Sequence, residues 1–211
     1  MNLIVIDKQP QLQYFDMDEA IEHCRNGISM LPWASTDNGR EPEVVLCAAG
    51  DIPMMETMAA AWWLRRIAPD LRVRVVNVVD LMRLFPARYH PHGMTTEQFV
   101  ELFTADRQVV FAFHGYRRAI HEIVHGHPNV DRIHVRGFSE QGTTTTPFQM
   151  VVQNEMSRFH LAAEAIRRVP RLAGRAPGLV AECDARIAEA TAYALEHFED
   201  QPEISDWVWT D

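Results

Sequence analysis

The chain has 211 residues, of which 47% are apolar, and this is enough for one substantial hydrophobic core. Its 29 Asp and Glu residues outnumber the 20 Lys and Arg residues, so the formal net charge is -9 at pH 7. No basic stripe interleaved with aromatic residues runs along the chain, which argues against nucleic-acid binding. We therefore expect a globular protein whose partners are not nucleic acids.

The spacing of the cysteines and the length of the apolar runs indicate the cellular compartment of the protein. Cys24, Cys47 and Cys183 are widely separated, odd in number and form no CxxC pair, which argues against a disulfide framework or a zinc site. The first ten residues lack a basic region, and no later apolar run approaches the ~18 residues of a membrane span. The sequence therefore predicts a cytoplasmic protein with reduced thiols and no membrane association.

Short β-branched runs alternate with segments of helical period. This alternation predicts a three-layer α/β fold, in which helices cover both faces of a mostly parallel sheet. The five predicted strands are Asn2–Ile6, Val44–Ala48, Val73–Val79, Val109–Phe113 and Arg132–Val135.

The segments between these runs predict helices. Met17–Arg25 is the first, and Ser35–Pro42 follows it as an exposed loop. Pro53–Ile67 is the second, with Asp51 as its N-cap and a proline in its first turn. A third helix begins near Thr95. Its predicted buried stripe is Phe99, Leu102 and Phe103.

Long helices dominate the chain from Pro147 onward. The pattern predicts one helix over Phe148–Val169 and another over Gly178–Phe198, with Pro170–Pro177 between them. We expect these helices to form a C-terminal extension of the same unit. Residues 1–211 are therefore predicted to be a single domain.

Six groups of residues carry a resemblance to one known family, in the same order and with compatible spacing. The three longer groups are Val75–Met82 (VVNVVDLM), Phe111–Tyr116 (FAFHGY), and His134–Gly137 followed by Gly142–Phe148 (GTTTTPF). The others are Leu3–Val5 with Lys8–Pro10, Asn154–Met156 with Arg158–His160, and Pro202–Ile204 with Asp206–Trp207. Together they span essentially the whole chain, which resembles the C-terminal domain of xylulose-5-phosphate/fructose-6-phosphate phosphoketolases.

The resemblance implies a transketolase C-terminal-like fold and a role in a larger enzyme. Members of that family use thiamine diphosphate and Mg²⁺ to cleave xylulose 5-phosphate or fructose 6-phosphate with inorganic phosphate, giving acetyl phosphate and an aldose phosphate. They are several times longer than this chain. We therefore expect the preceding phosphoketolase domains as partners, a homo-oligomer, and no turnover by this chain alone, which would act as a structural and dimerisation module.

The cofactor motif of thiamine enzymes is missing. That motif begins Gly-Asp-Gly and ends in an asparagine further along, and it anchors Mg²⁺ with oxygen ligands. Gly50-Asp51-Ile52 lacks the second glycine and has no matching asparagine in context. We expect thiamine diphosphate and Mg²⁺ to be bound by domains absent from this chain, and neither to be bound here.

Three residues at predicted strand ends are candidates for the border of an active site. Lys8 and Gln9 follow the first predicted strand at its carboxyl end, where ligands bind in open α/β sheets. An ammonium group there can pair with phosphate, and the resemblance implies that Lys8 lies near the substrate phosphate. The alternative is a solvated lysine between domains. His114 ends another strand, and a histidine held by backbone groups is its simpler interpretation.

Four consecutive threonines precede the first long C-terminal helix. They are Thr143, Thr144, Thr145 and Thr146. Capping of the helix accounts for one or two of them. The resemblance implies that this loop faces a partner subunit or a neighbouring domain, so we expect an interface or anion-binding loop. For Arg136 and Arg158, salt bridges within the domain are the favoured interpretation.

Two other functions remain open. One is a non-catalytic binding or regulatory module that holds a phosphorylated ligand in the crevice at the strand ends. The other is a metal-dependent hydrolase, because His121–His125 satisfies the HExxH pattern. Gly126 and Pro128 break the helix directly after this segment, and a zinc enzyme needs both histidines on a stable helix. We therefore expect no metal site.

Overall fold

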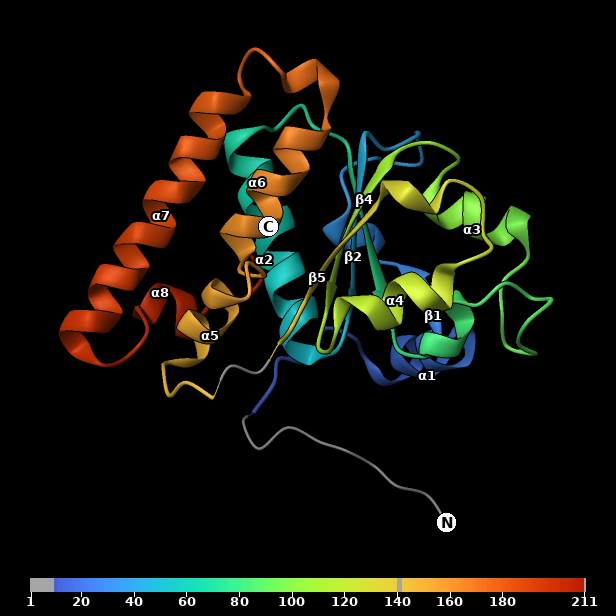
Figure 1. Ribbon diagram of the computed structural model, residues 1–211, viewed down its shortest axis with the longest axis horizontal. Helices are drawn as coiled ribbons and strands as arrows, with labels where there is room; N and C mark the ends of the chain where they lie inside the picture. Colours follow the sequence, from blue (N-terminus) through green and yellow to red (C-terminus); the bar gives the residue numbers. More distant parts are fainter. Residues whose placement is uncertain (1–9, 140–141, 211) are drawn as a thin grey trace.

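The computed structural model describes residues 10–139 and 142–210, which form three layers around a central sheet (Figure 1). The described residues form five strands in the order β1-β3-β2-β4-β5. Strands β2 to β5 are parallel, and β1 pairs antiparallel with β3 at one edge. The strands are β1 (Ile28–Met30), β2 (Val44–Ala49), β3 (Val73–Val78), β4 (Gln108–Phe113) and β5 (Ile133–Gly137).

The predicted α/β fold with a mostly parallel sheet is confirmed, and β2 to β5 lie where four of the predicted strands were placed. The predicted strand Asn2–Ile6 lies outside the described residues. The fifth strand of the described sheet is Ile28–Met30, which the sequence did not predict. Three residues are too few for an alternating pattern, and this strand is defined by its pairing with β3.

Helices cover both faces of the sheet. Figure 1 shows α2, α6 and α7 on one side, and α3 and α4 on the other. The eight helices of the described residues are α1 (Met17–Asn26), α2 (Asp51–Ile67), α3 (Thr96–Phe103), α4 (Arg117–Val124), α5 (Pro147–Gln153), α6 (Arg158–Arg168), α7 (Ala176–His197) and α8 (Pro202–Ser205). Short 3-10 turns are η1 (Pro32–Ala34), η2 (Leu81–Leu84), η3 (Val130–Arg132) and η4 (Pro170–Leu172). None of the helices in these described ranges is long and apolar enough to cross a membrane.

The alternation of side chains along each strand divides the core in two. On β2, Val44 and Leu46 pack against the α2 and α6 layer. Val45 and Cys47 point the other way, into the core beneath α3 and α4. All six residues of β2 are buried, which is the pattern of a central parallel strand covered on both faces.

Three local predictions need correction. The predicted helix Phe148–Val169 is two helices, because Glu155 adopts a left-handed φ of 52° and Ser157 caps a new helix at α6. Gly50 is the N-cap of α2, and Asp51 is its first helical residue. The loop Ser35–Pro42 is exposed only in its middle, since Asp37 is buried against Arg74.

A buried ion pair joins α2 to the start of α6. Arg158 Nη2 lies 2.7 Å from Glu56 Oε1, and Arg158 Nε lies 3.1 Å from Glu56 Oε2. The backbone N–H of Arg158 donates to Glu56 Oε2 at 2.6 Å. The side chains are 5% and 1% exposed, so the charges are compensated by each other rather than by water. The predicted salt bridge of Arg158 within the domain is confirmed.

The C-terminal tail folds back onto the same layer. The indole N–H of Trp62 donates to the carbonyl of Thr210 at 3.0 Å, and its ring meets Trp207 edge to face at 6.5 Å between centroids. Trp63 packs edge to face on Phe159 at 5.4 Å. The tryptophans of α2 therefore hold the tail and α6 in place.

Replacing Arg158 tests the importance of the buried ion pair. We expect Arg158→Met to lower the free energy of unfolding by about 3–5 kcal/mol, because the Glu56 carboxylate then stays buried without its cation. Chemical denaturation monitored by circular dichroism gives this value. The double variant Glu56→Leu/Arg158→Met should recover part of the loss, since it removes both charges.

The matched control is Arg107→Met. Arg107 pairs with Glu41 at 3.2 Å on the surface, where both side chains are about half exposed. An exposed pair of this kind is worth less than about 1 kcal/mol. An equal loss of stability in the two single variants would contradict the role assigned to the buried pair.

Candidate functional site

The carboxyl ends of β2, β3, β4 and β5 lie at one edge of the sheet, the lower edge in Figure 1. The chain passes from β2 to β3 on one side and then to β4 on the other, so the order reverses beside β2. Such a reversal is where open α/β sheets bind ligands. We call this edge the carboxyl edge.

Gly50 and His114 meet at the reversal. Gly50 follows β2 with a φ of 104°, and a Cβ atom built on it would lie 2.9 Å from the Cβ of His114. A larger residue therefore meets both backbone strain and a clash. The backbone N–H of His114 donates to the carbonyl of Ala49 at 3.2 Å. The backbone contact fixes the start of the β4–α4 turn against β2.

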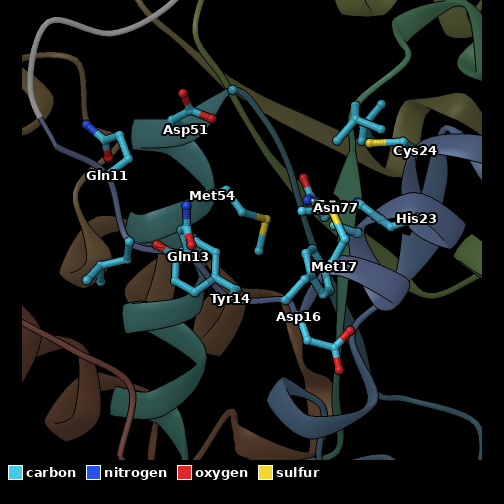
Figure 2. A pocket seen from close by; sticks show the side chains of 16 residues that line it. Gln11, Gln13, Tyr14, Asp16, Met17, His23, Cys24, Asp51, Met54 and Asn77 are labelled. Atoms are coloured by element: carbon cyan, nitrogen blue, oxygen red, sulfur yellow. Dashed lines mark hydrogen bonds between the residues drawn. The ribbon is translucent and has the colours of Figure 1, made fainter.

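A cavity of about 630 Å³ opens at the carboxyl edge next to the start of α2, and we call it the edge cavity. Its walls come from the segment before α1, from α1 itself, from the end of β3 and from the first turn of α2. Figure 2 shows Gln13 and Tyr14 on one side, His23 and Asn77 on the other, and Asp51 at the top.

His23 and Asn77 form the polar wall of the edge cavity. Asn77 Nδ2 lies 2.9 Å from His23 Nε2, and His23 Nδ1 contacts the hydroxyl of Ser29. With the amide as donor, Nε2 accepts and Nδ1–H donates to Ser29, which is the neutral form of the ring. The ring of Phe15 covers it at 4.9 Å between centroids.

Burial lowers the pKa of His23 below its ordinary value of 6.5. The folded state therefore resists protonation of this ring more than the unfolded chain does. The corresponding stability is fully present above pH 6.5, and it is lost as the pH falls from there toward the lower pKa of the folded state. His23 is neutral at pH 7 and presents no cation to the cavity.

The remaining ionisable groups make the edge cavity acidic. Burial raises the pKa of Tyr14 well above its usual range, and the carboxylates of Asp51 and Glu56 raise it further, so the phenol stays protonated. Asp16 and Asp51 are carboxylates at the cavity wall. None of the described residues that line it is a lysine or an arginine. The described wall therefore suits a neutral or cationic group better than a phosphate.

The predicted site residues that the structure describes, His114 and the four threonines, do not form one cluster. Lys8 and Gln9 lie outside the described residues. His114 is exposed, and its ring packs edge to face on Phe138 at 5.6 Å. The side-chain hydrogen bonds of the threonines are made with Gln149 and Gln153 rather than with His114.

The threonines divide their roles. Thr146 caps α5 by accepting from the backbone N–H of Gln149 at 3.3 Å, as capping predicted for one of the four. The hydroxyl of Thr143 donates to the side-chain oxygen of Gln153 at 3.1 Å. Thr143 and Thr144 are exposed. An interface or anion-binding role for Thr143, Thr144, Thr145 and Thr146 stays a prediction.

The HExxH segment spans the end of a helix. His121 is exposed on α4, and His125 is the C-cap residue rather than part of the helix. Across residues 10–139 and 142–210, no three His, Cys, Asp or Glu side chains are grouped to hold a metal ion. Arg136 pairs with Glu155 and lies 3.0 Å from Glu164, which confirms its salt bridges within the domain.

Sequence reasoning missed His23, Asn77 and Tyr14. Asn77 carried the clearest signal, because it is the one polar residue in the run Val75–Val79. His23 gave none, because a histidine on a polar helix is ordinary, and its partner lies 54 positions away. Tyr14 precedes the first helix in a segment without periodicity.

Comparisons with known proteins show which family the chain resembles. The family model described as the XFP C-terminal domain matches residues 8–209. The chain is 50% identical over 209 residues to a probable phosphoketolase 2 from Nostoc sp., and 54% identical over 212 residues to a probable phosphoketolase from Mycobacterium avium. Each match covers 99% of this chain and 26% of the relative. The chain thus spans about a quarter of the length of these relatives.

Solved structures show the same fold at low identity. A transketolase from Pichia stipitis in complex with xylulose 5-phosphate matches with a TM-score of 0.52 at 13% identity. The match covers 73% of this chain and 19% of the transketolase chain. The predicted transketolase-like fold is therefore confirmed.

Changing Asn77 tests the polar wall. We expect Asn77→Asp to raise the pKa of His23, because a carboxylate accepts from Nε2–H and favours the charged ring. Titration of the histidine ring signals by NMR measures this pKa directly. Asn38→Asp is the control, since Asn38 lies in an exposed loop. A His23 pKa that stays the same in Asn77→Asp would contradict the hydrogen bond between the two side chains.

Proposed function

Because this chain belongs to the XFP C-terminal domain family of the phosphoketolases, we propose that it works as the C-terminal domain of a thiamine-diphosphate-dependent phosphoketolase. The complete enzyme cleaves xylulose 5-phosphate or fructose 6-phosphate with inorganic phosphate, and it forms acetyl phosphate and an aldose phosphate. The match of the family model to residues 8–209 carries this proposal.

The cofactor does not fit the carboxyl edge of this chain. Ile52 stands where a thiamine motif has its second glycine, and Pro53 removes a backbone donor from the first turn of α2. Asn77, which also lines the edge cavity, uses its amide nitrogen on His23. We propose that thiamine diphosphate and Mg²⁺ are held by the preceding domains, and that this chain alone has no turnover.

Lys8 is the best candidate in this chain for contact with substrate. It is the single lysine of a sequence that has 19 arginines. A compact ammonium group at this position is suited to pairing with a substrate phosphate. We propose that Lys8 and Gln9, with His114, border the active site of the complete enzyme.

The alternative of a phosphate-binding regulatory module finds less support. The described wall of the edge cavity carries Asp16 and Asp51 and a neutral His23. A phosphate placed there would face two carboxylates without a compensating cation among the described lining residues. We also propose a cytoplasmic homo-oligomer, and the buried free thiols of Cys47 and Cys183 support a reducing compartment.

Acetyl phosphate formation tests the function. The complete polypeptide that contains this chain is expected to form acetyl phosphate from xylulose 5-phosphate, inorganic phosphate, thiamine diphosphate and Mg²⁺. The 211-residue chain under the same conditions is expected to form none. A complete polypeptide that binds the cofactor but forms no acetyl phosphate from either ketose phosphate would remove the proposal.

Lys8→Ala in the complete enzyme tests the border of the active site. Loss of a charge-assisted contact to phosphate costs about 1.5–3 kcal/mol, so kcat/KM should fall about 10- to 100-fold. Lys8→Arg should restore only part of the activity, because the guanidinium fork differs in shape. Arg40→Ala removes a cation from an exposed loop and serves as the control. Equal rates for Lys8→Ala and Arg40→Ala would contradict the role of Lys8.

A further inference from the structure

Large apolar side chains are exposed on α1 and after the carboxyl ends of β3 and β4. Met17 is 74% exposed and Val79 is 50% exposed, and both line the cavity. Ile21 lies one turn after Met17 on α1 and is also exposed. Tyr116 follows the carboxyl end of β4 and is 68% exposed. We call these four residues the edge patch.

The residues of the edge patch are grouped, unlike the scattered apolar residues of an ordinary protein surface. Scattered apolar residues on a surface are normal, but a group of them around a cavity marks an interaction site. Covering a side chain the size of valine or methionine stabilises a complex by about 1.5–3 kcal/mol at most. Among the residues of α1, His23 is the buried one, so the outer face of this helix has no partner within the described residues.

Charge restricts what covers the edge patch. Asp16 and Asp51 lie at the cavity wall, and Asp18 and Glu19 follow in the first turn of α1. Burying these carboxylates against an apolar or acidic surface would cost free energy unless cations compensate them. The complementary surface therefore has apolar side chains flanked by Lys or Arg.

The length and order of the related proteins indicate which surface this is. The curated relatives are about four times as long as the chain, since the match covers 26% of each, and the matching family is a C-terminal domain. Their remaining three quarters therefore precede the matched segment. In this chain residues 11–17, close to the start of the described part, line the edge cavity. The preceding part of such a polypeptide joins the chain on the N-terminal side of this lining segment.

We infer that the edge patch and the edge cavity are the docking surface for the preceding part of the phosphoketolase polypeptide, which inserts an apolar side chain flanked by basic ones. This inference rests on the proposed function and adds the face through which the domain is held. Docking there places His114 at the reversal of the sheet next to the covered surface. It also accounts for a neutral His23 and a protonated Tyr14, which add no charge to the interface.

Hydrogen–deuterium exchange locates the docking surface. The 211-residue chain alone is compared with the same chain inside the complete polypeptide. Backbone amides at 77–80 and 114–117 are expected to exchange at least about tenfold more slowly in the complete polypeptide, because covered amides open less often. Amides at 193–198 near the end of α7 should not change. Protection at the end of α7 without protection at the carboxyl edge would overturn the inference.

A double variant tests the patch itself. Met17→Glu/Val79→Glu should leave the unfolding midpoint of the isolated chain unchanged, because both side chains are exposed there. In the complete polypeptide it should abolish the protection at 77–80. Leu195→Glu/Phe198→Glu is the matched control, since both side chains are exposed on or beside α7. Protection that survives the first variant would overturn the inference.

The outcomes for docking and for function are separate. A complete polypeptide that forms acetyl phosphate but protects another face retains the proposed function and loses the docking surface. A polypeptide that protects the carboxyl edge but cleaves no ketose phosphate retains the surface and loses the function. A dimer of the isolated chain, detected by sedimentation and dispersed by Met17→Glu/Val79→Glu, would identify a second copy as the occupant and overturn the inference.

Discussion

Parallel pairing of β2 with both β3 and β4 is the constraint on which the rest of this structure depends. It places β2 at the centre of the sheet, where helices cover both of its faces, so every side chain of that strand is apolar and small or medium in size. It also directs the carboxyl ends of these strands to one edge. Gly50, Asn77 and His114 come from three different strand ends, and the pairing brings them to the same edge without any direct sequence relation.

The layer of α2 and α6 on one face of the sheet is held together by an ion pair and by the C-terminal tail. The Glu56–Arg158 pair fixes the start of α6 against α2. The C-terminal tail, which accepts a hydrogen bond from Trp62, covers the same helix. These contacts lie in the packed layer of α2 and α6, which adjoins the carboxyl edge, since the charges of Glu56 and Arg158 act on Tyr14 in the edge cavity.

Most of the sheet could be predicted from the sequence because its strands are continuous runs of β-branched and other apolar residues. β1 could not, since a three-residue strand exists only through its partner β3. The break between α5 and α6 was hidden for a related reason. The apolar pattern continues across it, and the left-handed residue that ends α5 is Glu155, where neither a glycine nor a proline marks the break.

The candidate site divides in the same way. His114 was predicted to lie at a strand end and the threonines to lie directly before a helix, because position beside an element is a local property. The pairing of His23 with Asn77 joins a helix to a strand 54 residues later, and no local pattern encodes it. The burial that keeps His23 neutral and Tyr14 protonated is likewise a property of the assembled edge. Sequence therefore locates the edge, while its electrostatic character follows from packing.

That electrostatic character separates two kinds of chemistry at the carboxyl edge. Substrate phosphate needs a cation, and the described wall of the edge cavity offers carboxylates, a neutral imidazole and a phenol. Protein docking needs apolar area with charges that a partner can match, and Met17, Val79 and the two cavity aspartates provide both. Under the proposed function, the cation for a substrate phosphate would come from Lys8 or from the preceding domains, and the described wall would support the active site without supplying its charged groups.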